Sequence, residues 1–281
     1  MKVSIIGAGK VGKVFAKALK NLQYNIISIS SKSNVSADDL AGEINCEVSY
    51  DWLKIAEADI IFITTNDGAI KTVMELLKER DILRKGQFIF HCSGVEGLDG
   101  LSFAKEKDVF IGSIHPLQSF VEEVNLKDVY FALDGDVEAI RLGEKIVNEF
   151  GGKTFIVPSD KRAIYHAAAC IASNYFVTLI HSAIMLFEQF NMEEHDAIQA
   201  LLPLIQGSID NIKKNGCGNS LTGPISRGDI ETVSKHIKGI KAMAPDELDL
   251  YKIMGKYTAD LARKYDRIDE VKYEQIKLEL E

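Results

Sequence analysis

The chain begins with an apolar run that leads directly into the stretch GAGKVG, residues 7–12. A glycine-rich turn between a strand and a helix lets the backbone turn sharply and lets the helix pack closely on a sheet. The first turn of such a helix offers backbone N–H groups and partial positive charge to a phosphate. This context predicts dinucleotide binding; a glycine turn without a ligand is the other interpretation. The expected contacts are Gly7, Ala8, Gly9, Lys10, Val11 and Gly12.

The first half of the sequence alternates short apolar runs with helix-like stretches. Runs typical of buried strands lie at 2–7, 25–30, 58–65, 87–93, 108–116, 129–133 and 153–157. Helical patterns lie at 10–22, 36–44 (with Ser36 as a possible N-cap) and 136–150. Continuous apolar strands separated by helices predict an α/β fold with a doubly wound, mostly parallel sheet covered on both faces.

The pattern changes after Pro158, where strand-like runs end and helical runs continue to Glu281. A chain of 281 residues suits two domains. We therefore expect a sheet domain over residues 1–158 and an all-helical domain over residues 159–281.

Composition narrows the class of protein. The net charge of −8, without a basic stripe, argues against binding to nucleic acid or to an anionic membrane. The four cysteines are far apart and form no CxxC pair, so neither a disulfide framework nor a metal site is expected. The apolar run at the amino terminus is too short and too rich in glycine for a signal peptide. The cytoplasm is therefore the expected location.

Residues 166–187 resemble a membrane span in length and apolar character. They include Ser173, Asn174, Thr178 and His181, whose polar groups would be costly in lipid. A helix that is apolar on most sides needs more neighbours than one small domain usually offers. We therefore expect a long helix buried between protein surfaces at the core of a homodimer.

The end of the second predicted strand indicates which dinucleotide binds. An NAD site usually has an acidic residue there, which accepts a hydrogen bond from the ribose 2′-OH. This chain has Ser30, Ser31 and Lys32 instead. Hydroxyls and a cation can bind a 2′-phosphate, so NADP is expected. A solvated turn is the alternative, because these residue types are common in turns.

Polar residues follow three of the predicted strands. Ligands of such sheets lie outside the carboxyl ends of the strands. Thr65 and Asn66 are expected to line the ribose or nicotinamide, and Ser93 ends the next strand. His115 precedes a proline, which biases its backbone to an extended form, so it can project as a proton donor or an oxygen-binding group. A histidine that caps a loop is the alternative. Cys92 is expected to be a small buried residue rather than a nucleophile.

The predicted helix at the start of the second domain has a polar row. At about 100° per residue, His166, Cys170 and Ser173 share one face, with Tyr165 and Asn174 at its margins. Buried polar groups need partners. A substrate or a cofactor amide would supply them, and so would helix–helix hydrogen bonds in a dimer.

The segment LTGPISRGD, residues 221–229, lies between two helical patterns. Arg227 can bind a carboxylate through two hydrogen bonds, and Asp229 can cap the following helix. The alternative is a structural loop in which Arg227 pairs with an acidic neighbour.

The stretches GAGKVG, HPLQSF, YHAAACIASNY and LTGPISRGD occur in this order. The chain thereby resembles bacterial proteins with a Rossmann-like domain followed by a DUF2520 domain, over nearly its whole length. The resemblance implies an NADP-dependent oxidoreductase whose helical domain is similar to the carboxyl-terminal domain of 6-phosphogluconate dehydrogenases and typically dimerises. The architecture is also similar to pyrroline-5-carboxylate, ketopantoate and prephenate enzymes and to β-hydroxyacid dehydrogenases.

The resemblance also bears on individual residues. Prephenate dehydrogenases carry a similar His-Pro whose histidine contacts the reacting hydroxyl, which favours His115. The β-hydroxyacid dehydrogenase pattern places a lysine and an asparagine four apart, whereas here Cys170 precedes Asn174. Lys161 is a weak substitute for that lysine. Some similar proteins are regarded as a separate class of ketopantoate reductase.

These features predict a reductase that transfers a hydride from NADPH to a small carbonyl substrate with a carboxylate, ketopantoate being the first candidate. The alternatives are an imine reductase of the pyrroline-5-carboxylate type and a protein that binds or senses NADP without turnover. No metal is expected. The residues expected to take part in catalysis are Ser93, His115, His166, Asn174 and Arg227.

Overall fold

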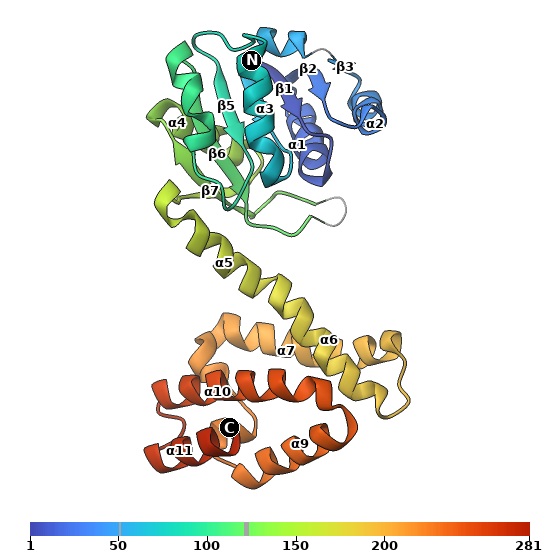
Figure 1. Cartoon of the computed structure of the whole chain (residues 1–281), viewed down its shortest axis with the longest axis vertical. Coiled ribbons are helices and arrows are strands. Elements are labelled where there is room, and N and C mark those ends of the chain that lie inside the picture. Colours follow the sequence, from blue (N-terminus) through green and yellow to red (C-terminus); the bar gives the residue numbers. More distant parts are fainter. Residues whose placement is uncertain (51, 121–123) are drawn as a thin grey trace. The chain divides into compact units, whose positions relative to one another are not determined.

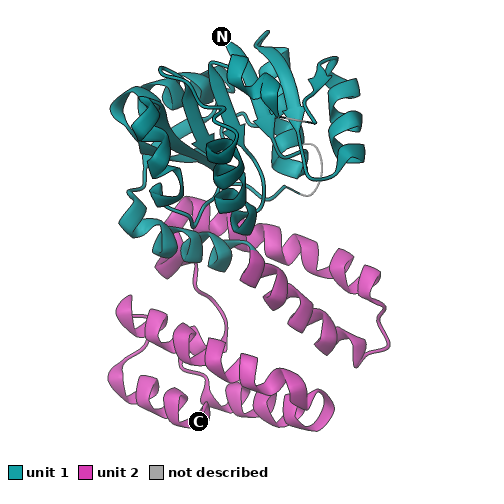
Figure 2. Ribbon diagram, turned by 45° about the horizontal axis from the view of Figure 1, so that its top comes forward, with its two compact units in different colours: residues 1–173 teal, residues 174–281 magenta. Residues whose placement is uncertain are grey.

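The computed structural model describes residues 1–50, 52–120 and 124–281. The chain folds into two compact units, residues 1–173 and residues 174–281 (Figure 2). The domain boundary expected from the sequence lies after residue 158, so the first unit also takes in the first helix of the expected helical domain.

The first unit is built on an eight-stranded sheet (Figure 1). The strand order is β3-β2-β1-β4-β5-β6-β7-β8, and every adjacent pair is parallel except β6 and β7. This confirms the expected doubly wound, mostly parallel sheet. The strands are β1 Lys2–Ile6, β2 Asn25–Ser30, β3 Glu47–Val48, β4 Ile60–Ile63, β5 Phe88–His91, β6 Phe110–Pro116, β7 Tyr130–Gly135 and β8 Lys153–Ile156.

Helices cover both faces of this sheet (Figure 1). The α-helices of the unit are α1 Lys10–Asn21, α2 Asn34–Ile44, α3 Asp67–Glu79, α4 Val137–Glu149 and α5 Arg162–Ala172. Three short 3₁₀ helices are η1 Leu53–Glu57, η2 Asp99–Lys107 and η3 Ser159–Lys161. The helix expected over 36–44 begins two residues earlier, because Ser33 rather than Ser36 is its N-cap.

The central strands are largely apolar because they bury both faces, whereas the edge strands β3 and β8 are partly exposed. In β4, Ile60 and Phe62 pack in one hydrophobic cluster with α1, α2 and α4. Ile61 and Ile63 pack in a second cluster with α3 and η2 on the other face. All four side chains are 0% exposed.

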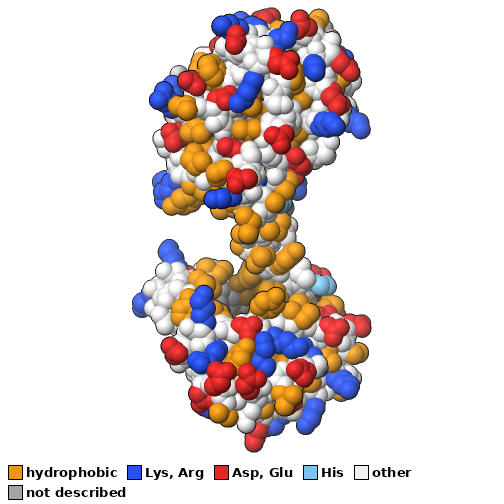
Figure 3. All heavy atoms as spheres, turned by 60° about the vertical axis from the view of Figure 1, so that its left-hand side comes forward, with side chains coloured by type: hydrophobic (Ala, Val, Ile, Leu, Met, Phe, Trp, Pro, Cys, Tyr) orange, Lys and Arg blue, Asp and Glu red, His pale blue; other side chains and the backbone are white. Residues whose placement is uncertain are grey.

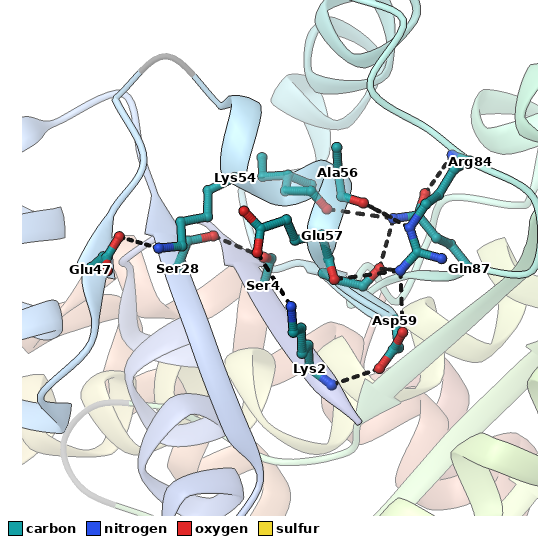
Figure 4. A network of polar contacts seen from close by, with 12 residues as sticks. Lys2, Ser4, Ser28, Glu47, Lys54, Ala56, Glu57, Asp59, Arg84 and Gln87 are labelled. Atoms are coloured by element: carbon teal, nitrogen blue, oxygen red, sulfur yellow. Dashed lines mark hydrogen bonds and ion pairs between the residues drawn. The ribbon is translucent and has the colours of Figure 1, made fainter.

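A polar network closes the edge of the sheet at the amino ends of β1 and β4 (Figure 4). Gln87 Nε2 donates to the Ala58 carbonyl at 2.7 Å, and Arg84 Nη2 donates to the same oxygen at 3.0 Å. The backbone N–H of Lys2 donates to the Asp59 carboxylate at 2.8 Å. The polar groups of this edge are used internally, which leaves the carboxyl ends of the strands as the edge that can bind a ligand.

The second unit is helical, and residues 174–281 contain no strand. Its α-helices are α6 Asn174–Glu188, α7 Glu194–Ser220, α8 Pro224–Arg227, α9 Ile230–Met243, α10 Leu248–Lys264 and α11 Glu270–Glu279, with the 3₁₀ helix η4 Pro245–Glu247. Ile225, Val233 and Ile276 belong to a core shared by α8 to α11. Ile184 and Ala197 belong to a smaller core between α6 and α7.

The apolar stretch expected as one helix over 166–187 is divided into α5 and α6 at Ser173. The helical segment 159–188 is long and apolar enough to cross a membrane, by length and composition only. Hydrophobic side chains gather over it in Figure 3. Ile164, Ile171 and Val177 are 74%, 61% and 66% exposed, so the single chain leaves them uncovered.

Candidate active site

The glycine-rich turn has the close contacts that its sequence predicts. Gly7 has a φ of +116°, which favours glycine, and a Cβ there would lie 2.9 Å from the backbone of Thr64. A Cβ on Gly12 would lie 2.0 Å from the Gly7 carbonyl oxygen. The Thr64 hydroxyl also donates to this oxygen at 2.7 Å. The helix α1 can therefore approach β1 this closely only with glycine at position 12.

The start of α1 is open to a ligand. A Cβ on Gly9 would meet no atom within 4 Å, and Gly9 precedes the helix without a side-chain cap. The first turn, which begins at Lys10, contains no acidic residue. Its backbone N–H groups lack partners within the helix and carry partial positive charge. The bare Gly9 and this helix end fit the pyrophosphate of a dinucleotide.

The loop after β2 uses two of its serines within the protein. Ser30 is buried, and its hydroxyl donates to the Ser49 carbonyl at 2.9 Å. The Ser33 hydroxyl accepts from the N–H of Ser36 at the start of α2. Ser31 is half-buried and Lys32 is exposed. Ser31 and Lys32 are therefore the side chains of this loop that can reach a ligand.

Of the two polar residues expected to contact a ligand after β4, one is hydrogen-bonded within the protein and the other is not. The Asn66 side chain accepts from the N–H of Ala69 at 3.0 Å and caps α3. The hydroxyl of Thr65 is buried and has no partner among the residues that the structure describes. An unpaired buried hydroxyl is costly, so Thr65 is the better candidate for a ligand contact at this position.

The end of β5 is held by hydrogen bonds within the turn that follows it. His91 is fully buried, and its Nδ1 accepts from the N–H of Ser93 at 3.2 Å. The Ser93 hydroxyl accepts from the N–H groups of Val95 and Glu96, the latter at 2.9 Å. Burial raises the pKa of the Cys92 thiol, which therefore stays protonated, as expected for a residue that is not a nucleophile.

His115 at the end of β6 is hydrogen-bonded to the first helix after the sheet. Its Nδ1 lies 2.7 Å from the hydroxyl oxygen of Tyr165 on α5. The two rings pack edge to face, with centroids 5.5 Å apart. This pairs the histidine expected from the sequence with a phenol that can orient it.

Arg162, the first residue of α5, is a fully buried cation. Its Nη1 donates to the Ser93 carbonyl at 2.8 Å, and its Nη2 donates to the Ser113 hydroxyl on β6. Its Nε has no partner among the described residues. Asp134 is the acidic group that favours its charged form, although no described carboxylate forms an ion pair with it. Since burying a charge is costly, a guanidinium fixed between β5 and β6 indicates a specific role.

Burial and positive charge act together on the ionisable groups of this edge. Burial lowers the pKa of His115 to about 4, with Arg162 as the next cause. The same two causes lower the pKa of His91 to about 3. Burial raises the pKa of Tyr165 to about 12, against the effect of Arg162. His115 is therefore neutral at pH 7, rather than titrating near neutral pH as its residue type suggests.

Gly94 lies against two imidazole rings. A Cβ there would lie 2.7 Å from Nε2 of His115 and 2.7 Å from Cδ2 of His166. The ring centroids of these histidines are 6.2 Å apart. In the expected polar row of α5, Cys170 Sγ lies 3.8 Å from Nδ1 of His166, and Ser173 is exposed.

Two of the expected residues belong to the second unit. Asn174 is the exposed first residue of α6. Arg227 is exposed and forms no hydrogen bond or ion pair with any residue that the structure describes. Asp229 accepts from the N–H of Thr232 at 3.1 Å and from its hydroxyl at 2.7 Å, which confirms the predicted cap of α9.

Of the residues expected to take part in catalysis, the first unit brings together Ser93, His115 and His166. Beside them lie Arg162, which the sequence analysis did not select, and Tyr165, which it placed at the margin of a helix face. The available signal was their spacing of three residues, which puts both on one face of α5. Their partners, which lie on β6 and just after β5, are 49 to 69 positions away in the sequence.

Models of two known domains match the chain. Residues 1–116 match the Rossmann-like domain, and residues 129–258 match a domain of unknown function, DUF2520. These matches confirm the resemblance stated for the sequence.

Solved structures share the fold over nearly the whole chain. A Bacteroides fragilis protein provisionally described as an NADP oxidoreductase has a TM-score of 0.75 and 21% identity, covering 93% of this chain and 98% of its own. The protein TM1727 from Thermotoga maritima has a TM-score of 0.71 and 28% identity, covering 94% and 99%. A 1-pyrroline-5-carboxylate reductase from Streptococcus pyogenes has a TM-score of 0.61 and 16% identity, covering 99% and 98%.

Among curated proteins, the chain is 27% identical over 125 residues to a glutamyl-tRNA reductase from Oceanobacillus iheyensis. The match covers 43% of this chain and 27% of that relative's length.

Proposed function

We propose that this protein, which joins a Rossmann-like domain to a DUF2520 domain, is an NADPH-dependent reductase of a small C=O or C=N substrate that carries a carboxylate. The observation that carries the proposal is the pair of His115 and Tyr165, hydrogen-bonded at 2.7 Å at the carboxyl end of β6. A polar hydrogen donor at this edge is what a reduction needs, because the oxygen or nitrogen gains negative charge.

The residues of the first unit fit the cofactor. The backbone of residues 7–12 would hold the pyrophosphate, and Ser31 and Lys32 would bind the 2′-phosphate. The provisional description of the Bacteroides fragilis protein as an NADP oxidoreductase supports the choice of NADPH over NADH. When bound, the reduced nicotinamide supplies the hydride.

The protein's own contribution is to bind the heteroatom that gains charge. His115, neutral at pH 7, would donate its N–H to the substrate oxygen or nitrogen and then give up that proton. His166, whose ring lies beside the same space over Gly94, would help to orient the substrate. The Ser93 hydroxyl accepts two backbone hydrogen bonds and keeps its own hydrogen for donation.

For the carboxylate we propose Arg227, because its guanidinium is exposed and unpaired in the described part of the chain. Asn174 would orient the reacting group. Ketopantoate is the first candidate among carbonyl substrates. The fold shared with a 1-pyrroline-5-carboxylate reductase makes cyclic imines the alternative.

We further propose a homodimer through residues 160–187 and later helices. The exposed Ile164, Ile171 and Val177 support it, because monomeric proteins rarely leave such an apolar stripe in water.

A screen of NADPH oxidation against 2-keto acids and cyclic imines tests the function. Turnover of at least one substrate by the wild-type protein, with a loss of roughly 100-fold in the His115→Ala variant, is expected. Fluorescence titration with NADPH distinguishes the remaining cases. Tight binding without turnover of any substrate would favour a nucleotide-sensing protein, and absence of binding would refute both readings.

A further inference from the structure

His115 has a hydrogen-bond partner, Tyr165, and a nearby cation, Arg162, both on α5. Its Nδ1 shares a hydrogen bond of 2.7 Å with the Tyr165 hydroxyl. Arg162 lies three residues earlier on α5, hence on the same helix face, and its charge acts on both Tyr165 and His115. The phenol and the imidazole are thus hydrogen-bonded between α5 and the end of β6, and the guanidinium acts on both through its charge.

The guanidinium cannot move away from this position without breaking contacts. It is 0% exposed and donates to the Ser93 carbonyl, just after β5, and to the Ser113 hydroxyl, within β6. No described carboxylate forms an ion pair with it, although Asp134 favours its charged form, and its charge acts on the neighbouring His115 and Tyr165.

Charged and titratable groups from three elements act on His115. They are Asp67 at the start of α3, His91 of β5, and Arg162, Tyr165 and His166 of α5. The two strongest effects, burial and Arg162, both oppose a positive charge on the ring, and Asp67 opposes them more weakly. A neutral imidazole has one N–H, so a hydrogen bond accepted by Nδ1 from Tyr165 leaves the N–H on Nε2.

We propose that Tyr165 passes a proton to Nδ1 of His115 while Nε2 of the same ring protonates the reduced substrate, and that Arg162 stabilises the phenolate that remains. This rests on the proposed function, and it assigns Tyr165 and Arg162 as positioning residues that act through His115.

The proton transfers balance. When the substrate carbon accepts a hydride, the electron pair of its C=O or C=N bond moves to the heteroatom. The Nε2–H bond of His115 breaks and the heteroatom gains that proton. The O–H bond of Tyr165 breaks as an N–H bond forms at Nδ1. The cycle closes when Nε2 of His115 takes a proton from water and Nδ1 returns its proton to the phenolate, which restores both the tautomer of His115 and the half-buried hydroxyl of Tyr165.

The charge of Arg162 favours the phenolate form of Tyr165, which the proposed proton transfer requires. Burial alone raises the pKa of Tyr165, which disfavours a phenolate, and Arg162 is the group that opposes this. A fixed cation placed where negative charge develops costs no reorganisation during the reaction.

The first test uses the protein without cofactor or substrate. ¹⁵N NMR of labelled histidines, with His115 assigned by its absence in His115→Gln, is expected to show a proton on Nε2 and no protonation between pH 8 and pH 5.5. Tyr165→Phe is expected to shift the Nδ1 resonance, and Arg162→Met to raise the pKa of His115. A wild-type His115 that carries its proton on Nδ1, or that titrates near pH 6.5, would overturn the relay.

The second test is kinetic. Tyr165→Phe removes one oxygen atom and is expected to lower kcat by roughly 10- to 100-fold, with KM and NADPH affinity unchanged. Tyr130→Phe is the matched control, because the Tyr130 hydroxyl forms no hydrogen bond with a described residue. Wild-type kcat in Tyr165→Phe would overturn the relay while leaving the reductase function intact. If the wild-type protein does not bind NADPH, the proposed reductase function is wrong, and so is the relay that rests on it.

Discussion

The hydroxyl of Thr64 donates a hydrogen bond of 2.7 Å to the carbonyl oxygen of Gly7. The end of β4 thereby holds the glycine-rich turn that follows β1. This hydrogen bond fixes the backbone of the turn. A substitution of a single glycine in the turn can therefore be tested for its effect on ligand binding.

Gly9→Ala is expected to raise the Kd for NADPH at least tenfold without changing Tm. Its new methyl group meets no protein atom within 4 Å, so only a ligand that approaches the bare backbone is affected. Fluorescence titration and thermal melting measure the two quantities. Gly68→Ala, which also meets no atom within 4 Å, is the control and should change neither. Wild-type affinity in Gly9→Ala would show that the turn does not bind the pyrophosphate.

Lys32→Asp is expected to weaken NADPH binding more than NADH binding, because the new carboxylate repels the 2′-phosphate. The two cofactors are titrated separately. Ser30→Ala is the comparison, since the Ser30 hydroxyl is used by Ser49 and its loss should lower Tm rather than affinity. A wild-type protein that binds NADH as tightly as NADPH would refute the assignment of NADP.

Arg227→Ala is expected to raise the KM for the substrate while leaving Tm unchanged, because the side chain is exposed and unpaired in the described residues. Asp229→Ala should leave the KM unchanged and lower the free energy of unfolding by about 1 kcal/mol, because it removes the N-cap of α9. Steady-state kinetics and melting curves separate the two effects. An unchanged KM in Arg227→Ala would make the segment 221–229 structural.

Stability is expected to fall as the pH drops below about 6.5, the value for histidine in an unfolded chain. The native state holds His91 and His115 neutral down to about pH 3 and 4 respectively, so the unfolded state binds more protons in this window. The free energy of unfolding should fall by about 1.4 kcal/mol per pH unit for each proton.

Denaturant titrations at several pH values measure this slope. His91→Asn should make it shallower, because one buried histidine no longer titrates, whereas the exposed His195→Asn should not. A slope that is identical in His91→Asn and in the wild type would contradict the assignment.

Light scattering at micromolar concentration is expected to give twice the chain mass of 31.1 kDa. Ile171→Glu should shift the protein toward the monomer, because it puts a charge on the exposed apolar face of α5. Val137→Glu changes a similarly exposed apolar residue on α4 and should have no effect. A wild-type monomer that floats with lipid vesicles would instead indicate that residues 159–188 contact a membrane.

The sheet was predictable because its signals are local. Seven of the described strands lie in apolar runs, and the GAGKVG turn identifies the strand that precedes it and the helix that follows. The two-residue strand β3, Glu47–Val48, has no such run and was not predicted. The division of the apolar stretch at Ser173 was not predictable, since the residues on both sides form helices well.

The residues of the site were predictable only where the local sequence around a single residue suggests its role. His115 was selected from its position at a strand end. Arg162 looks like a solvated residue in the sequence SDKRAIY, and only its contacts with Ser93 and Ser113, which are distant in the sequence, reveal a buried cation. Ser30 and Asn66 were expected at the cofactor, but their side chains bond the protein itself, because serine and asparagine serve turns and caps as readily as ligands.

Gly94 has a consequence for how this protein tolerates change. Because the rings of His115 and His166 occupy the room that a methyl group would need there, any larger residue acts as a wedge that moves both rings together. The glycine-rich turn at residues 7–12 follows β1, and its contacts with Thr64 do not involve these rings. A methyl group at position 94 is thus expected to disturb the two histidine rings without disturbing the glycine-rich turn.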